Sequence, residues 1–145
     1  MNIYINSLVF NNSLVDGPGI RSLVFFQGCD IHCPGCQNKS TWDIKKGQLV
    51  EVSDLIYEIK RNVRNKKVTI TGGEPMLQKE ALLELLKGLD GFDIALYTGH
   101  SRDCIPLEIL ERITYLKSGP FVERLKTSVM PYVGSSNQKF EKVGR

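Results

Sequence analysis

Three cysteines stand within eight residues, and this cluster constrains the fold more than any other feature of the chain. Cys29, Cys33 and Cys36 are spaced C-x3-C-x2-C and follow directly on the apolar run at residues 23–26. Three thiolate ligands on one loop are typical of a metal cluster. A [4Fe–4S] cube has four irons, so three thiolates would leave one iron open, as catalytic zinc sites keep one position free. The chain is therefore expected to place a metal-binding loop at the end of a strand.

Two other interpretations of the cysteines have to be weighed. A disulfide across such short spacing would strain a loop that contains proline and glycine. A structural zinc ion normally needs four ligands, and the candidates for the fourth are His32, adjacent to Cys33, and Cys104, about seventy residues away. The spacing favours an iron–sulfur site and leaves zinc as the alternative.

The length of 145 residues suits one domain with its own core, short of the ~250 residues of a complete (β/α)8 barrel. We therefore expect a single domain over residues 1–145. The N-terminus has no basic flank followed by an apolar core, and no apolar run is long enough to cross a bilayer. Four cysteines, three of them clustered, suit a reducing cytoplasm, where we expect the protein to reside.

The formal net charge of +3 is too small to indicate a nucleic-acid partner. The charge is unevenly distributed, because residues 112–145 carry seven basic and two acidic side chains, a local charge of +5. Such a basic tail is compatible with a solvated surface or with an acidic partner.

Apolar runs without a helical period alternate with segments that have one. Strands are expected at 20–27, 68–71, 92–97 and 113–117, helices at 53–63, 76–89 and 107–111, and an opening strand or hairpin at 3–10. This order implies right-handed βαβ crossovers. The predicted fold class is α/β with a mainly parallel sheet.

Each unusual loop of the chain follows one of these strands. The loops lie at residues 29–36, 72–75, 98–100 and 118–120. Since open parallel sheets place working residues beyond the carboxyl ends of their strands, we expect the four loops to meet at one edge.

The second of these loops reads Gly72-Gly73-Glu74-Pro75. By itself it fits a simple turn before a helix, with Glu74 as a first-turn acid. Beside an open iron it predicts a ligand-binding loop. Two glycines let the backbone approach a small ligand, and a carboxylate can accept hydrogen bonds from an ammonium group.

Taken together, the motifs resemble a known family. The C-x3-C-x2-C spacing with Gly-Gly-Glu-Pro about forty residues later is similar to the radical S-adenosylmethionine (SAM) enzymes. Asp-Gly-Pro-Gly-Ile-Arg at 16–21 resembles the glycyl-radical-enzyme activases. Further motifs narrow the resemblance to activating enzymes of anaerobic (class III) ribonucleoside-triphosphate reductases: Asn-Lys-Ser-Thr-Trp at 38–42, Tyr-Thr-Gly at 97–99 and Gly-Ser-Ser-Asn-Gln at 134–138. The resemblance spans about residues 14–140.

The resemblance implies a radical SAM domain, a partial (β/α) barrel that binds a [4Fe–4S] cluster and SAM. The implied ligands of three irons are Cys29, Cys33 and Cys36. The implied contacts of SAM, which chelates the fourth iron, are Gly72, Gly73, Glu74 and Thr98. A flavodoxin-type donor would supply one electron, SAM would be cleaved to a 5′-deoxyadenosyl radical, and that radical would take a hydrogen atom from a glycine of the reductase. No further catalytic side chain is implied.

The implied partner is the reductase, with residues 120–145 as a docking tail in which Asn137 and Gln138 would become ordered on the partner. A homodimer within that complex is compatible with the resemblance, whereas no nucleic acid or membrane is expected. Two alternatives stay open: a radical enzyme acting on a small molecule, like 7-carboxy-7-deazaguanine synthase, and a zinc-stabilised binding module.

The chain departs from the family pattern at Thr114, Ser118 and Gly35. Thr114 and Ser118 stand where acidic residues are expected, which puts an ionic contact there in doubt. Gly35 precedes the last cysteine where many radical enzymes carry an aromatic residue, so an aromatic contact to adenine must come from elsewhere. Arg21, in the 16–21 motif, could pair with Asp16 or be solvated.

Overall fold

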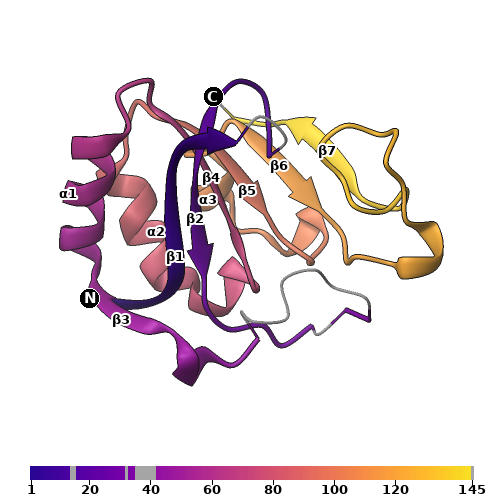
Figure 1. Cartoon of the computed structure of the whole chain (residues 1–145), viewed down its shortest axis with the longest axis horizontal. Coiled ribbons are helices and arrows are strands. Elements are labelled where there is room, and N and C mark those ends of the chain that lie inside the picture. The colour runs from indigo at the N-terminus through magenta and orange to yellow at the C-terminus, as the bar shows by residue number, and fades with distance from the viewer. Residues whose placement is uncertain (14–15, 32, 35–41, 145) are drawn as a thin grey trace.

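A single mixed sheet forms the centre of the molecule in the computed structural model, which describes residues 1–13, 16–31, 33–34 and 42–144 (Figure 1). Within these residues the strands are β1 Asn2–Ser13, β2 Arg21–Phe26, β3 Gln48–Glu51, β4 Lys67–Gly72, β5 Asp93–Tyr97, β6 Tyr115–Ser118 and β7 Lys139–Lys142. The α-helices are α1 Val52–Asn62, α2 Lys79–Gly88 and α3 Leu107–Leu110. Short 3-10 turns are η2 Ile44–Lys46, η3 Pro75–Gln78, η4 Arg102–Cys104 and η5 Glu123–Leu125.

The strand order is β3-β1-β2-β4-β5-β6-β7. The four predicted strands β2, β4, β5 and β6 lie side by side and parallel, as expected from the crossovers. The prediction of a mainly parallel sheet is nevertheless wrong, because the three other pairings among the described strands, at the two edges, are antiparallel. The expected partial barrel is not confirmed, since β3 and β7 are the edges of one sheet.

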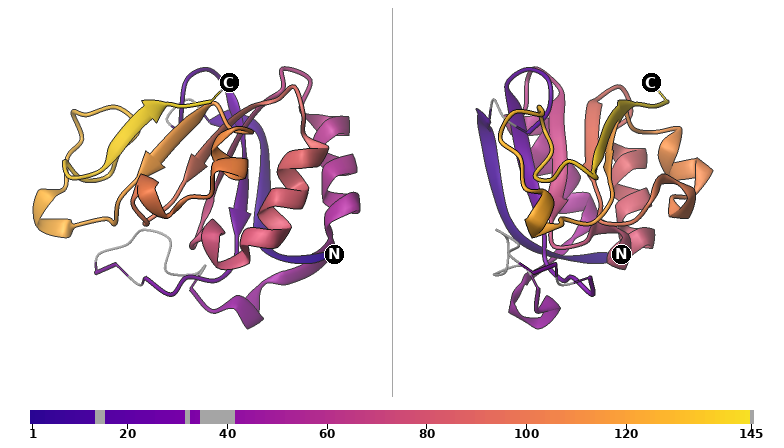
Figure 2. Two further views of the ribbon diagram at one scale, coloured as in Figure 1. Left: turned by 180° about the vertical axis from the view of Figure 1, so that it is seen from behind. Right: turned by 90° about the vertical axis from the view of Figure 1, so that its right-hand side faces the viewer.

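The main apolar core lies between the sheet and the helices, which cover one face (Figures 1 and 2). Alternate residues of the parallel strands point into it, because successive side chains of a strand point to opposite faces. They include Val24, Phe26, Val68, Ile70, Ile94 and Leu96. From α2 the apolar stripe contributes Leu82, Leu85 and Leu86 at helical spacing. No helix in the described part of the chain is long and apolar enough to cross a membrane.

The segment predicted as one helix at 76–89 is divided into η3 and α2. Pro75 begins the first turn, and Gln78 lies outside helical geometry at φ −115° and ψ 48°. The Gln78 side chain pairs with the backbone of Tyr4, accepting from its N–H at 2.8 Å and donating to its carbonyl at 2.9 Å. Because η3 is rotated away from the α2 stripe, Leu77 is 44% exposed, whereas the helical pattern predicts that it is buried.

The opposite face of the sheet has a polar centre at Arg21, whose side chain is completely buried. Its guanidinium group pairs with Asp93 at 2.9 Å and also donates to Thr69 Oγ1 and to the carbonyl of Pro18. The expectation that Arg21 pairs with Asp16 or is solvated is therefore wrong. Asp16 is held instead by Ser13, whose hydroxyl donates to its carboxylate at 2.5 Å. The 16–21 motif thus fastens the segment before β2 to the sheet.

The C-terminal residues belong to the folded domain, contrary to the expectation of a tail that becomes ordered on a partner. β7 pairs antiparallel with β6, and Phe140 stacks on Tyr115 with a centroid distance of 5.5 Å. Gln138 is 7% exposed and accepts from the N–H of Gly134 at 2.8 Å. Asn137 donates to the carbonyl of Pro120 at 2.9 Å. The motif at 134–138 therefore closes a loop against the end of β6.

Candidate active site

A cavity of about 180 Å³ lies at the carboxyl ends of the four parallel strands. In Figure 1 these ends point toward the segment that follows β2. The walls of the cavity include residues from all four loops that the sequence predicts to meet. They are Cys29, Ile31 and Cys33 after β2, Thr71, Gly72, Gly73 and Glu74 at β4, Tyr97, Thr98 and Gly99 at β5, and Lys117 and Gly119 at β6. The predicted convergence at one edge of the sheet is confirmed.

The cysteine-bearing segment is held at both ends by hydrogen bonds. The N–H of Cys29 donates to the carbonyl of Trp42 at 3.0 Å, and the buried Gln27 side chain donates to the carbonyl of Asp43 at 2.7 Å. Cys29 and Cys33 are half-buried, and both line the cavity. The third predicted ligand, Cys36, lies outside the described residues, as does His32. Within the described part of the chain no three His, Cys, Asp or Glu side chains gather around one point.

Gly72 lies where only glycine can fit. Its φ is +117°, and a Cβ atom built on it would lie 2.3 Å from the carbonyl oxygen and 2.4 Å from the nitrogen of Phe26. Since these are backbone atoms of the neighbouring strand β2, they cannot move aside as a flexible side chain could. The N–H of Gly73 then donates to the Phe26 carbonyl at 3.1 Å. The glycine pair therefore lets the loop after β4 lie directly against the strand that leads to the cysteines.

Glu74 is 1% exposed and joins three of the converging loops. Its own N–H donates to the carbonyl of Gly28 at 2.7 Å, next to the first cysteine. Its carboxylate accepts from Thr98 Oγ1 at 2.8 Å, from the N–H of Gly99 at 2.7 Å and from the N–H of Met76 at 2.9 Å. A carboxylate has about four acceptor positions, so these three donors leave room for about one more. The geometry suits a ligand ammonium group.

The side of the cavity formed by the end of β6 and the C-terminal segment was only partly predicted. Its residues are Lys117, Gly119, Phe121, Gly134 and Gln138. The loop at 118–120 and the motif at 134–138 were the signals that could have indicated it. Gln138 connects the two, because its Nε2 donates to the carbonyl of Gly119 at 3.0 Å. Thr114 and Ser118, where acids were expected, are both buried.

Two aromatic residues, Tyr97 and Phe121, line the cavity. The hydroxyl of Tyr97 is buried without a hydrogen-bond partner among the described residues. Burial raises the pKa of this hydroxyl well above its usual value, and the Asp16 carboxylate raises it further. The Tyr97 hydroxyl is therefore protonated at neutral pH.

The chain matches the family described as "4Fe-4S single cluster domain" over residues 15–141. It is 33% identical over 138 residues to the anaerobic ribonucleoside-triphosphate reductase-activating protein of Escherichia coli K12, a match that covers 86% of this chain and 90% of the relative. This chain belongs to the family of those activating proteins. A protein of the same description from Salmonella typhimurium has the same identity and coverage. The pyruvate formate-lyase-activating enzyme of Clostridium pasteurianum is 42% identical over 79 residues, covering 51% of this chain and 33% of that enzyme.

The family assignment confirms the enzyme class expected from the motifs. The chain is a radical SAM enzyme of the glycyl-radical-activating type, and its cofactors are a [4Fe–4S] cluster and SAM. The cavity fits these groups, since it has thiols on one side, the backbone of Gly72 and Gly73 in its wall, and a buried carboxylate with spare acceptor capacity. The zinc-stabilised module is not supported.

Among solved structures, the crystal structure of QueE from Escherichia coli has a TM-score of 0.59 and 23% sequence identity, covering 81% of this chain and 70% of that chain. At this identity the likeness shows the fold alone.

Proposed function

We propose that this enzyme generates a glycyl radical on an anaerobic ribonucleoside-triphosphate reductase by reductive cleavage of SAM. The observation that carries the proposal is the 33% identity to the E. coli activating protein over 86% of the present chain. The match to pyruvate formate-lyase-activating enzymes covers about half of the chain, so it supports the reaction type more than the protein substrate. We further propose a flavodoxin-type carrier as the electron donor, a cytoplasmic site of action and a homodimer within the complex with the reductase.

We assign Cys29, Cys33 and Cys36 as ligands of three irons. Two of these cysteines lie half-buried in the cavity wall. The N–H of Glu74 donates to the carbonyl of Gly28 and fixes the start of their loop against the loop after β4, while the N–H of Cys29 donates to the carbonyl of Trp42. We assign the amino group of SAM to Gly72, Gly73 and Glu74, since the glycines let a ligand reach the backbone and the carboxylate is aimed by Thr98 and Gly99. Thr98 acts here by positioning Glu74. When bound, the cluster and SAM supply the electron transfer and the carbon radical that removes a hydrogen atom from glycine.

The iron assignment is tested with alanine at each of the three cysteines, purified without oxygen. Cys104→Ala is the matched control, because Cys104 is exposed and lies outside the cavity. We expect the wild type and the control to be brown, to hold about four irons and to cleave SAM. Each of the three other variants should stay soluble and lose SAM cleavage. Retained cleavage in any of the three would contradict the assignment.

The protein substrate is tested by mixing the loaded enzyme with SAM, a reductant and an anaerobic ribonucleotide reductase, and by recording the glycyl radical with electron paramagnetic resonance (EPR). A small-molecule radical enzyme would produce no such signal and would bind no large glycyl-radical protein. Formation of the radical at a yield that follows the amount of enzyme would support the proposal.

We propose that residues 120–145 contribute the docking surface for the reductase within a single domain of residues 1–145. The loop after η5 exposes Val129 at 88% and Met130 at 41%, and the exposed cations Arg124 and Lys126 lie beside it. Large exposed apolar side chains next to charges are typical of interaction sites. Deleting the segment would remove β7 from the sheet, so a deletion cannot serve as the test.

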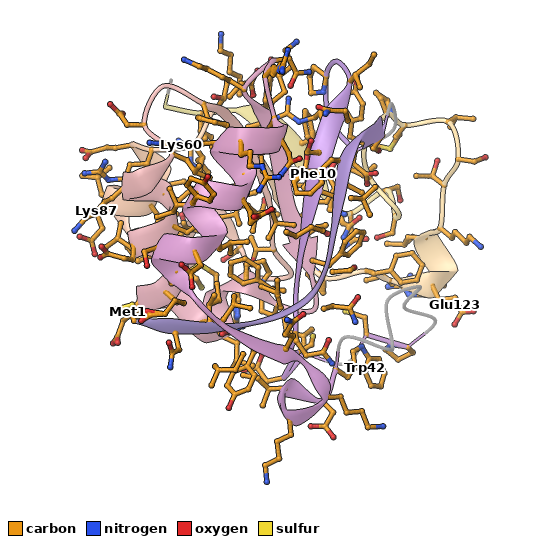
Figure 3. All side chains as sticks on the ribbon, turned by 60° about the vertical axis from the view of Figure 1, so that its left-hand side comes forward. Met1, Phe10, Trp42, Lys60, Lys87 and Glu123 are labelled. Atoms are coloured by element: carbon orange, nitrogen blue, oxygen red, sulfur yellow. The ribbon has the colours of Figure 1, made fainter. Side chains whose placement is uncertain are left out.

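Charge reversal at Arg124 and Lys126 gives a cleaner test. The control reverses Lys60 and Lys87, which lie on the helical side of the molecule, opposite Glu123 of η5 (Figure 3). We expect the first pair to weaken the complex about tenfold or more and the control pair to leave it unchanged. Equal binding by both double variants would remove this surface from the proposal.

A further inference from the structure

Gln27 is completely buried directly after β2, two residues before the first cysteine. Both ends of its side-chain amide are bonded within the chain. Its Nε2 donates to the carbonyl of Asp43 at 2.7 Å, and its Oε1 accepts from the Nδ2 of Asn6 at 3.0 Å. Asn6 belongs to β1, whereas Asp43 lies just beyond the cysteine-bearing segment, as the N-cap of η2. One amide therefore joins the sheet to the far end of that segment.

The backbone of Gln27 is fixed by two further hydrogen bonds. Its N–H donates to the carbonyl of Tyr4 at 3.1 Å, and its carbonyl accepts from the Nε2 of Gln78 at 3.0 Å. Gln78 in turn is bonded to the backbone of Tyr4 through both ends of its own amide. Because β1 and η3 both hold Gln27, its amide is a fixed point to which the far end of the cysteine-bearing segment is attached.

The far end of the segment also packs closely on the Gln27 side chain. Gly47 is the C-cap of η2, and a Cβ atom built on it would lie 2.6 Å from the Cβ and 2.7 Å from the Cγ of Gln27. Gly47 has φ −79° and ψ 165°, so the close packing, rather than the backbone conformation, requires glycine. Beside it, the N–H of Cys29 donates to the carbonyl of Trp42 at 3.0 Å. The cysteine-bearing segment thus has a closed base, in which its two ends are bonded to each other.

A closed base matters for a metal site, because ligands that are already brought together lose less conformational entropy when the metal binds. We propose that Gln27 is a positioning residue of the iron–sulfur site, which holds the segment with Cys29, Cys33 and Cys36 closed and slows the loss of iron. This inference rests on the proposed function, in which these cysteines bind the cluster, and adds to it a residue that does not line the cavity.

The test measures how fast the cluster-loaded enzyme loses iron to the chelator bathophenanthroline disulfonate, without oxygen or urea. Gln27→Met keeps a similar volume and removes the donor to Asp43 together with the acceptor for Asn6. Asn6→Ala is the matched control, because it removes only the second of these hydrogen bonds. Gly47→Ala acts on the same base from the other side, since its Cβ would press on Gln27, and serves as a second variant if Gln27→Met does not fold.

A second control separates positioning from the stability of the fold. Arg21→Met breaks a buried polar network at the opposite end of β2, away from the cysteines, and should lower the urea midpoint. We expect Gln27→Met to lose iron about tenfold faster than the wild type and Gly47→Ala about threefold faster or more. Asn6→Ala and Arg21→Met should lose iron within about twofold of the wild-type rate, even though Arg21→Met is less stable.

Equal rates for Gln27→Met and Asn6→Ala, or a wild-type rate for Gly47→Ala where Gln27→Met does not fold, would overturn the inference. Iron loss as fast in Arg21→Met as in Gln27→Met would overturn it as well, since the loss would then follow the free energy of unfolding. These results leave the proposed function intact. A wild type that takes up no iron–sulfur cluster would refute the proposed function, and the inference with it.

Discussion

Replacement of the buried Arg21 is the most direct test of how the 16–21 motif stabilises the fold. Its guanidinium group makes five hydrogen-bond contacts of 2.7–2.9 Å, to Thr69, Pro18, Val68 and both the carbonyl and the carboxylate of Asp93. Methionine fills a similar volume and keeps the apolar contacts, so Arg21→Met removes mainly these contacts. We expect the variant to be less stable because several buried acceptors lose their donors.

The magnitude follows from the number and burial of the acceptors. Five contacts at roughly 1 kcal/mol each give an upper value of about 5 kcal/mol. Part of the loss is offset, because the folded state no longer has to bury a cation. Asp93 can also regain water, since its side chain is 30% exposed. We therefore expect a loss of about 3 kcal/mol in the free energy of unfolding, or roughly 6–12 °C in Tm for a domain of this size.

The assay is urea unfolding followed by far-ultraviolet circular dichroism, at matched iron content and without oxygen. Arg61→Met is the control, since Arg61 is 64% exposed and its contact with Glu58 is long at 3.7 Å. The control should stay within about 0.5 kcal/mol of the wild type. Arg21→Lys should not rescue stability, because one ammonium group cannot reach acceptors spread around a planar guanidinium. An equal urea midpoint for Arg21→Met and Arg61→Met would refute the reasoning.

Two further predictions concern the cavity wall. Tyr97→Phe should be neutral or stabilising by up to about 1 kcal/mol, because it removes a buried hydroxyl that has no partner among the described residues. Because the pKa of Tyr97 is higher in the folded than in the unfolded state, the free energy of unfolding of the wild type should be intact below the unfolded pKa of about 10 and should fall as the pH rises above it. Tyr97→Phe should lack this loss. Identical slopes of the unfolding free energy against pH between about pH 9 and 11 would contradict the prediction. Gly72→Ala should cost about 2 kcal/mol more than Gly91→Ala and should lower iron content, because both glycines have positive φ but only at Gly72 would the Cβ meet backbone atoms. Equal unfolding free energies for the two alanine variants would show that the close contact with Phe26 has no energetic weight.

The sequence alone determined the four parallel strands and the meeting of their loops. These follow from local information: apolar runs of strand length, helical periods between them and glycine-rich breaks at their ends. Because the strands joined by such helical crossovers run parallel, every loop after a strand lies at the same edge of the sheet. For this reason Cys29, Gly72 and Thr98 could be expected in one cavity before any distance was known.

The tertiary structure decided which distant residues complete the site and the sheet. Edge strands β3 and β7 are four residues long, and their direction depends on the strand they meet, so periodicity could not reveal them. Arg21 forms its ion pair with Asp93, 72 positions away in the chain, because β2 and β5 lie on either side of β4. Lys117 and Gln138 reach the cavity through the pairing of β6 with β5 and β7, and long-range pairing of this kind leaves no periodic signal in the chain.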